Sequence, residues 1–361
     1  MVLFSYIFRQ YLKWFAVVLL SFSSVIILLD YFELFRRARN KNDIGFAVIS
    51  KMVFFHFPDI IKQLIPLIAL FSSLILFINL GRSSQLVIMR MSGSSLRRLL
   101  IPVFAVIALY TSFDFMFLNS ISAQLMQKFE SYNNRLFKGN DNTIRLSSSG
   151  LWLRESKENQ YTIVQIKRIQ LSKGLLHGLS LYVFSDQNTL LKRIDADKAM
   201  ITPDGWLVIN AKVLKPNRQP KIMASLKWQT ELDLTSIESQ SLGPDTISFW
   251  QLKNYISILR NAGLSTVKYE MLWHGTLSQP LLILTMAFLG ALVSFWAMQR
   301  RMNIPIVLVI IVFAYIIYVL FNVVGAMGRN YTIPVFLAAW APPMMSLFFI
   351  SALLLHFEEK V

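Results

Sequence analysis

The side chains that most often carry out catalysis are few and scattered in this chain. Cysteine is absent, and the four histidines, His56, His177, His274 and His356, stand far apart in the sequence. A chain without cysteine offers no thiolate nucleophile, no thiolate metal ligand and no disulfide. The sequence also lacks the G-x-x-x-x-G-K-[ST], G-x-G-x-x-G, H-E-x-x-H and G-x-S-x-G motifs. We therefore predict no catalytic residue, no metal site and no cofactor in this chain.

The chemistry that the sequence does favour is the binding of anions. Four basic residues, Arg36, Arg37, Arg39 and Lys41, follow the first apolar segment. Arginine binds phosphate through two parallel hydrogen bonds, so this cluster could bind an anionic lipid. The same side chains could instead be anchors that reach the lipid headgroups at the end of a membrane helix. The residues alone leave both interpretations open.

Six apolar segments must position these residues. They lie near residues 13–35, 52–80, 99–121, 272–298, 304–324 and 333–356. Each is long enough to cross a bilayer, which takes about 20 residues. The mean hydropathy of +0.50 and the hydrophobic share of 55% are typical of a membrane protein. We expect the first segment to be a retained membrane helix and not a cleaved signal peptide.

The distribution of basic residues predicts how these segments are oriented, because cytoplasmic loops carry an excess of Lys and Arg. The loop after the second segment contains Arg82, Arg90, Arg97 and Arg98, so we expect it in the cytoplasm. The long stretch between the third and fourth segments then lies on the other side. The net charge of +16 fits a membrane surface, and without a basic stripe interleaved with aromatic residues we expect no nucleic acid partner.

This cytoplasmic loop contains a short amphipathic stretch that ends at Ser92 and Gly93. Leu86 and Met89 are three positions apart and share one face of the predicted helix. Such a helix either packs on the membrane helices or docks into a groove of a partner ATPase and passes movement to them. Both interpretations are consistent with the spacing.

The stretch from about Asn140 to Thr246 has the pattern of a β domain. Apolar residues alternate in short runs, at 161–166, 179–184, 206–209 and 223–228. Such runs, separated by turn residues, predict an antiparallel sandwich or jelly roll. A helix is predicted after it, with Phe249, Leu252, Tyr255, Ile256 and Leu259 on one stripe and Gly263 as its end. We expect this helix near the outer membrane surface.

The order R-S-x-x-L-V-x-M-x-x-S-G over residues 82–93 resembles the lipopolysaccharide-export permeases of the LptF/LptG family. Further similarities lie along the whole chain: Pro58 with Pro66, residues 150–152, the helix at 247–263, and Tyr269 and Trp273 followed by residues 279–281. The helix at 247–263 and the set that runs from Tyr269 to residue 281 are more similar to LptG than to its sister LptF.

The resemblance implies a non-hydrolytic permease subunit of an ABC-type exporter. Such an exporter extracts lipopolysaccharide from the inner membrane and passes it to a periplasmic bridge protein. The implied partners are an LptF-type sister permease, an LptC-type bitopic protein and an LptB-type ATPase dimer, which binds the ATP and Mg. The residues leave two alternatives, an envelope-sensing membrane adaptor without transport activity and a lipid-modifying membrane enzyme.

The resemblance also suggests roles for individual residues. For the phosphates of lipopolysaccharide we expect Arg36, Arg37, Arg39, Lys41 and, from the second segment, Lys62. For coupling to the ATPase we expect Arg82, Gln85, Leu86, Met89 and Arg90. Members of the family often have Glu where this chain has Gln85, so a contact there would be a neutral hydrogen bond and not a charge-assisted one.

The expected fold is an α+β membrane protein with six transmembrane helices, three on each side of a periplasmic antiparallel β-jellyroll. Residues 1–125 hold the first three helices, with a cytoplasmic coupling helix at about 83–93. Residues 126–247 form the jellyroll domain. Residues 248–361 form the interfacial helix and the last three transmembrane helices, in a bacterial inner membrane.

Overall fold

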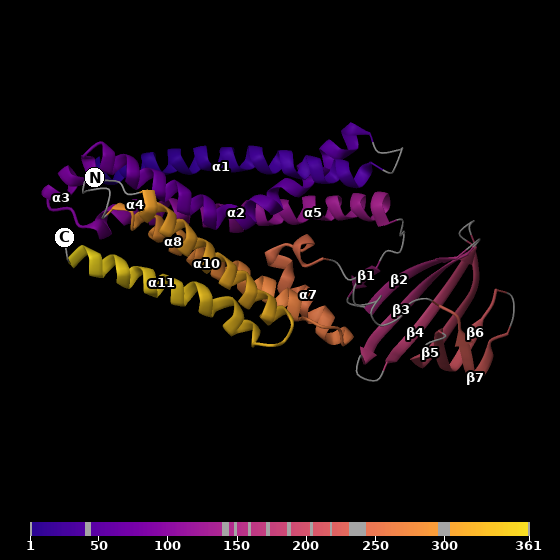
Figure 1. The fold of residues 1–361 in the computed structure, drawn as a ribbon. Coiled ribbons are helices and arrows are strands. Elements are labelled where there is room, and N and C mark those ends of the chain that lie inside the picture. The colour runs from indigo at the N-terminus through magenta and orange to yellow at the C-terminus, as the bar shows by residue number, and fades with distance from the viewer. Residues whose placement is uncertain are drawn as a thin grey trace. The chain divides into compact units, whose positions relative to one another are not determined.

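The computed structural model describes residues 2–39, 45–138, 144–147, 150–157, 160–170, 174–185, 189–202, 205–216, 219–230, 243–294 and 304–359. The chain divides into two compact units (Figure 1). The helical unit consists of Met1–Phe129 and Glu270–Val361, and the sheet unit consists of Glu130–Tyr269. The predicted sheet domain spans residues 126–247, and the sheet unit of the structure runs from Glu130 to Tyr269 and includes the helix that follows the sheet.

Six helices within the described residues are long and apolar enough to cross a membrane, which confirms the predicted architecture. They are α1 (Val2–Ala38), α2 (Phe46–Arg82), α4 (Leu96–Phe113) with its continuation, α8 (Val267–Ala291), α10 (Ile304–Arg329) and α11 (Val335–Glu359). The continuation of α4 runs through η1 (Asp114–Leu118), α5 (Asn119–Asn133) and η2 (Asn134–Lys138). The short helix α3 (Gln85–Met91) lies between α2 and α4.

Several helices are longer than the apolar segments that predicted them. Both α1 and α2 have 37 residues. At 1.5 Å per residue each is about 55 Å long, well beyond the roughly 30 Å of a hydrocarbon core. Polar residues at the helix ends continue the same backbone hydrogen bonding, so the end of an apolar run does not mark the end of a helix. α1 contains neither proline nor glycine, whereas α2 contains Pro58 and Pro66.

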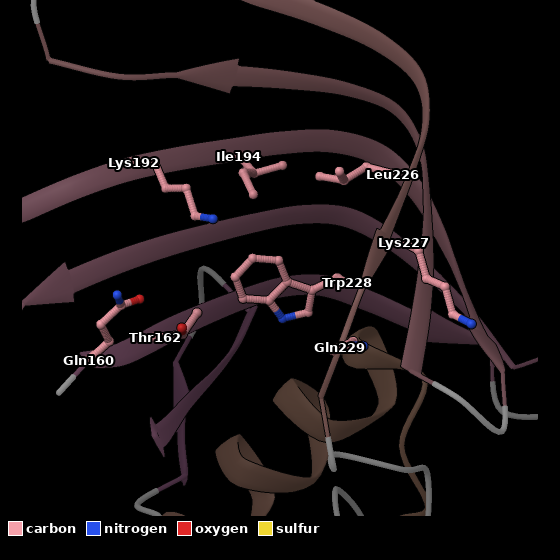
Figure 2. A pocket seen from close by; sticks show the side chains of 8 residues that line it. All are labelled: Gln160, Thr162, Lys192, Ile194, Leu226, Lys227, Trp228 and Gln229. Atoms are coloured by element: carbon pink, nitrogen blue, oxygen red, sulfur yellow. The ribbon is translucent and has the colours of Figure 1, made fainter. Parts of the chain in front are cut away.

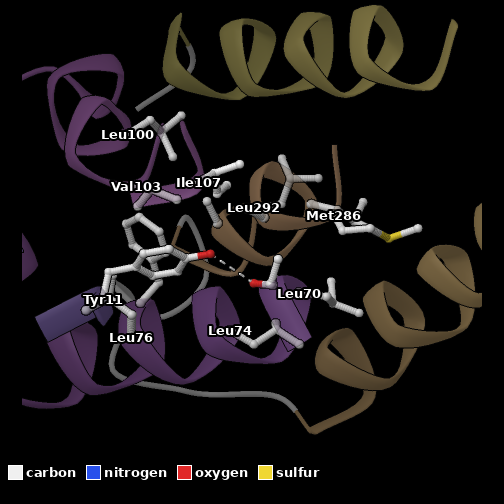
Figure 3. Close-up of a cluster of buried hydrophobic side chains, with 14 of the residues drawn as sticks. Tyr11, Leu70, Leu74, Leu76, Leu100, Val103, Ile107, Met286 and Leu292 are labelled. Carbon is white, nitrogen blue, oxygen red and sulfur yellow. Dashed lines mark hydrogen bonds between the residues drawn. The ribbon is translucent and has the colours of Figure 1, made fainter. Parts of the chain in front are cut away.

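The core of the helical unit forms around α2 (Figure 3). Tyr11 of α1 is fully buried there, and its hydroxyl donates to the carbonyl oxygen of Ala69 over 3.4 Å. On another side α8 approaches closely, because Ser73 Oγ donates to the Ala287 carbonyl over 2.6 Å and Gly290 faces the Leu70 carbonyl. Small residues at such contacts let two membrane helices come near each other.

The sheet unit contains a seven-stranded antiparallel sheet whose strand order follows the chain. The strands are β1 (Ile144–Ser147), β2 (Gly150–Lys157), β3 (Gln160–Gln170), β4 (Leu175–Ser185), β5 (Leu190–Thr202), β6 (Gly205–Leu214) and β7 (Lys221–Trp228). All four predicted runs lie within strands, and the predicted antiparallel sheet between the third and fourth membrane helices is confirmed. Within the described residues the connections are those of a meander.

The sheet curls so that its last strand reaches back to its second. Thr230, two residues beyond β7, donates from Oγ1 to Glu155 Oε1 of β2 over 2.9 Å. The curl encloses buried side chains such as Trp206 and Val164. A curved sheet can bury one face in this way without a second, separate sheet.

Helix α7 (Phe249–Ala262) follows the 3-10 turn η4 (Pro244–Thr246) and packs against β1, β2 and β3. Its buried side chains are Leu252, Tyr255, Leu259 and Ala262, so the predicted apolar stripe faces the sheet. Gly263 ends the helix as predicted, with a φ of +75°. A Cβ there would collide with the Ile169 carbonyl of β3, so the turn and the packing both require glycine.

Candidate functional site

At the C-terminal end of α1, two arginines form ion pairs with the same carboxylate, that of Glu33. Glu33 Oε2 lies 2.7 Å from Arg36 Nη2, and Glu33 Oε1 lies 2.8 Å from Arg37 Nε. These partners are three and four positions apart, the spacing at which helix side chains meet. The two arginine side chains remain 76% and 50% exposed, so one carboxylate orients two guanidinium groups that still face outward. Arg39, just beyond the helix, is also exposed, and Lys41 lies outside the described residues.

Just before this cluster α1 contacts α2, and the α2 residue that it contacts packs in turn on α5. Asp30 Oδ1 lies 3.1 Å from Nδ1 of His56 on α2. The His56 ring stacks on Phe129 of α5, with ring centroids 4.3 Å apart. These contacts hold the turn that precedes the arginines, so the cluster projects from a supported helix end.

Lys62 does not share the exposure of the arginines. Its Nζ lies 3.9 Å from Oδ1 of Asp114 in η1, and its side chain is only 17% exposed. The structure therefore brings Arg36 and Arg37 together, and places Lys62 in a separate ion pair between α2 and the π-helical turn. Such single π turns inside α-helices often lie at functional positions.

The short helix predicted at about 83–93 is present as α3. Leu86 is fully buried, and Met89 packs against the helical core. The exposed apolar side chains are instead Ile88 and Met91, at 64% and 84%. Sequence reasoning missed these two, although a helix that is apolar on more than one face is a sign of a second contact surface.

Gln85, at the start of α3, contacts the N-terminal part of α1. Its Oε1 accepts a hydrogen bond from the Tyr6 hydroxyl over 2.8 Å. A cavity of about 450 Å³ lies beside this bond, and Gln10, Trp14, Asn79 and Arg82 are among the residues that line it. Arg82 closes α2 and is exposed, whereas Arg90 is half-buried near the end of α3.

The curled sheet has a cavity of about 390 Å³ on its inner face (Figure 2). Gln160 and Thr162 of β3, Lys192 of β5 and Trp228 of β7 are among the residues that line it. The Lys192 ammonium lies 5.2 Å from the centre of the Trp228 ring, at the distance of a cation–π contact. The sequence did not indicate this cavity, because only the curl brings three non-adjacent strands together.

In the part of the chain that the structure describes, no three His, Cys, Asp or Glu side chains gather where they could hold a metal ion.

Comparison with known proteins gives two kinds of match. Residues 5–356 match the family described as lipopolysaccharide export system permease LptF/LptG. The chain is 24% identical over 293 residues to lipopolysaccharide export system permease protein LptG of Haemophilus influenzae, which is 80% of either chain. It is also 24% identical over 307 residues to the protein of the same name from Escherichia coli strain K12, 82% of either chain. These matches confirm the resemblance that residues 82–93 suggested, and its leaning toward LptG.

Proposed function

Because the chain belongs to the LptF/LptG family of lipopolysaccharide export system permeases, we propose that it is the non-hydrolytic subunit of an ATP-driven exporter. In this proposal the exporter extracts lipopolysaccharide from the inner membrane and passes it to a periplasmic bridge protein. The chain itself is a multi-pass inner-membrane protein with a periplasmic sheet domain. One observation carries the proposal furthest: the exposed arginines and the contact with α3 lie at opposite ends of the same helix, α1.

The arginine end of α1 is the proposed lipid-binding site. Arg36, Arg37 and Arg39 are exposed and cationic, and a guanidinium group matches a phosphate in shape and charge. Glu33 orients two of them without covering them. Lys41 belongs to this proposal by its place in the sequence. Lys62 has a different role in it, since its pairing with Asp114 supports the helix behind the site.

The α3 end is the proposed docking site for an LptB-type ATPase, which supplies the ATP and Mg. Exposed apolar residues on a short helix are suited to insert into a groove of a partner. We place this contact on Ile88 and Met91, with Arg82 and Arg90 as charged neighbours. The buried Leu86 and the packed Met89 instead hold α3 against the membrane helices.

The exposure of two membrane helices supports a sister permease as partner. In the most apolar stretches of α1 and α10 only 17% and 11% of the residues are buried, against 67% in α2. An LptF-type subunit packed against α1 and α10 would cover these faces and enclose a cavity for lipid between the two permeases. An LptC-type bitopic protein completes the proposed assembly.

The test is to purify the tagged chain in nanodiscs under mild conditions and to identify the co-purifying proteins and lipids by mass spectrometry. Recovery of an ATPase, a second permease and lipopolysaccharide is the expected result. If the chain is recovered alone under conditions that preserve a control ABC transporter, the exporter proposal is wrong. An envelope-sensing adaptor would then be the better account of the periplasmic domain.

A further inference from the structure

We propose that the hydrogen bond between Tyr6 and Gln85 is the link through which movement of α3 reaches α1. Both residues would then act in the transport cycle by holding α1 in position relative to α3. This inference rests on the proposed function, in which a partner ATPase moves α3. The Tyr6 hydroxyl donates to Gln85 Oε1 over 2.8 Å, and the two residues are half-buried and 79 positions apart in the chain.

The backbone on either side of α3 is built to turn sharply. Ser84, just before the helix, has a φ of +56°, and Gly93, just after it, has a φ of +81°. A positive φ at a residue other than glycine is strained and needs support from its surroundings. The short helix is therefore bounded by two sharp bends, and a displacement of α3 need not be passed along the backbone into α2 or α4.

The side of α3 that faces α1 is not tightly filled. The cavity of about 450 Å³ beside Gln85 extends between α1 and α2, past Gln10, Trp14 and Asn79. Open space there leaves the face of α1 that carries Tyr6 and Gln10 loosely packed, although Ile7 and Tyr11 of the same helix are fully buried in the helical core. The directed polar bond from Tyr6 to Gln85 therefore adds to the apolar contacts of Leu86 and Met89, which hold α3 against the helical core.

The continuity of α1 carries such a displacement to the lipid end. Tyr6 lies in its second turn and Arg36 in its last, on one helix of 37 residues without proline or glycine. Sharp kinks in helices arise mainly at Pro, at Gly/Ser pairs and at π-turns; α1 has no Pro, Gly or π-turn, so we treat it as one rod of about 55 Å. A shift of α3 would thus be passed along α1 toward the arginines as far as the contacts of Tyr11 and Asp30 with α2 allow.

The first test measures whether α1 and α3 move together. The chain has no cysteine, so Ser5→Cys and Ser92→Cys on exposed positions give the only two spin labels in this chain, once the cysteines of the partner proteins have been replaced. In the purified complex we expect the same label distance without nucleotide and with a non-hydrolysable ATP analogue. Tyr6→Phe should make the distance differ between the two states. The matched control is Tyr11→Phe, which removes a hydroxyl bond from α1 to α2 and should leave the distance unchanged.

The second test measures lipid released per ATP hydrolysed by the reconstituted complex. Tyr6→Phe and Gln85→Leu should each lower this ratio about threefold to tenfold, the range that one neutral hydrogen bond spans. Gln85→Glu keeps an acceptor for the Tyr6 hydroxyl and should preserve the ratio. The double variant Tyr6→Phe with Gln85→Leu should be no worse than either single variant, because both remove the same bond.

Three results would overturn the link. The label distance could differ between the two nucleotide states already in the wild type, or stay the same in both states after Tyr6→Phe. Tyr6→Phe and Tyr11→Phe could also change the label distance by the same amount. These results are distinct from a failure of the proposed function. If the wild-type complex hydrolyses ATP and releases no lipid, the exporter role fails, while the label distances still decide whether α1 and α3 are linked.

Discussion

Three exposed arginines at the end of α1 carry the first prediction. Replacing Arg36, Arg37 and Arg39 with Ala should lower photocrosslinking of the complex to lipopolysaccharide at least tenfold, because each charge-assisted contact is worth about 1.5–3 kcal/mol. Assembly with the ATPase should persist, since these side chains are exposed and far along the chain from α3. Crosslinking yield and ATPase recovery are measured on the same purified sample.

The controls for this prediction separate position from charge. Arg9→Ala with Arg98→Ala removes basic side chains at the other end of the unit and should leave crosslinking unchanged. Glu33→Gln should raise crosslinking at low salt, because it frees Arg36 and Arg37 from their carboxylate. Exposed ion pairs contribute at most about 1 kcal/mol, so Glu33→Gln should lower stability by no more than that. Equal losses in the triple variant and in the Arg9–Arg98 control would contradict a specific lipid site.

Lys62 and Asp114 form a pair whose disruption should affect stability more than lipid binding. Lys62→Met leaves the Asp114 carboxylate with less compensation in a poorly solvated place, and breaking buried pairs costs up to about 3–5 kcal/mol. Lys62→Met with Asp114→Asn should recover most of this loss, because no charge then remains in the pair. Thermal unfolding in detergent compares the single and double variants. A single variant as stable as the wild type would show that the pair contributes little.

Between elements, the contact of α2 with α8 sets how closely two membrane helices approach. A Cβ at Gly290 would lie 2.7 Å from the Leu70 carbonyl oxygen, so no larger side chain fits without separating the helices. Gly290→Leu should therefore lower the thermal stability of the helical unit and the yield of folded protein. Gly275→Leu is the matched control on the same helix, because a Cβ at Gly275 would meet no other atom within 4 Å. Equal stability of the two variants would contradict close packing at Gly290.

Helices and strands could be predicted from the sequence where one physical signal, such as hydropathy or alternation, was strong along the whole segment. Length and hydropathy indicated the six membrane helices, and alternation indicated β3, β4, β6 and β7. Strand β5 was missed because Lys192, Arg193, Asp195, Asp197 and Lys198 interrupt its apolar pattern. Those charges are tolerated where neighbouring groups pair them, as Asp195 does with Arg193 and Ser180. The curl of the sheet and the cavity at Trp228 depend on three-dimensional contacts that no local pattern contains.

For the candidate site, the types of the residues involved were predictable from the sequence. Which side of each helix is exposed was not. The arginines were found because charge density after an apolar run is visible in the sequence. On α3 the apolar residues Leu86, Val87, Ile88, Met89 and Met91 surround the helix, so periodicity could not say which of them face the core. Burial by the membrane helices decides this: Leu86 is inside and Ile88 and Met91 are outside.

At the scale of the whole molecule, α3 should connect the helical unit to the ATPase through its exposed face. Replacing Ile88 and Met91 with Ser removes the exposed apolar surface and should reduce ATPase recovery about tenfold or more, since buried apolar anchors dominate such contacts. Thermal stability of the isolated permease should stay within about 0.5 kcal/mol, as for other surface substitutions. Leu86→Ala is the opposite case: it opens a cavity in the core and should cost about 2–5 kcal/mol of stability. Comparing ATPase recovery with thermal unfolding for both variants separates docking from folding. If the Ile88–Met91 variant still recovers the ATPase fully, α3 is a packing element, and the partner must contact another cytoplasmic surface of this chain.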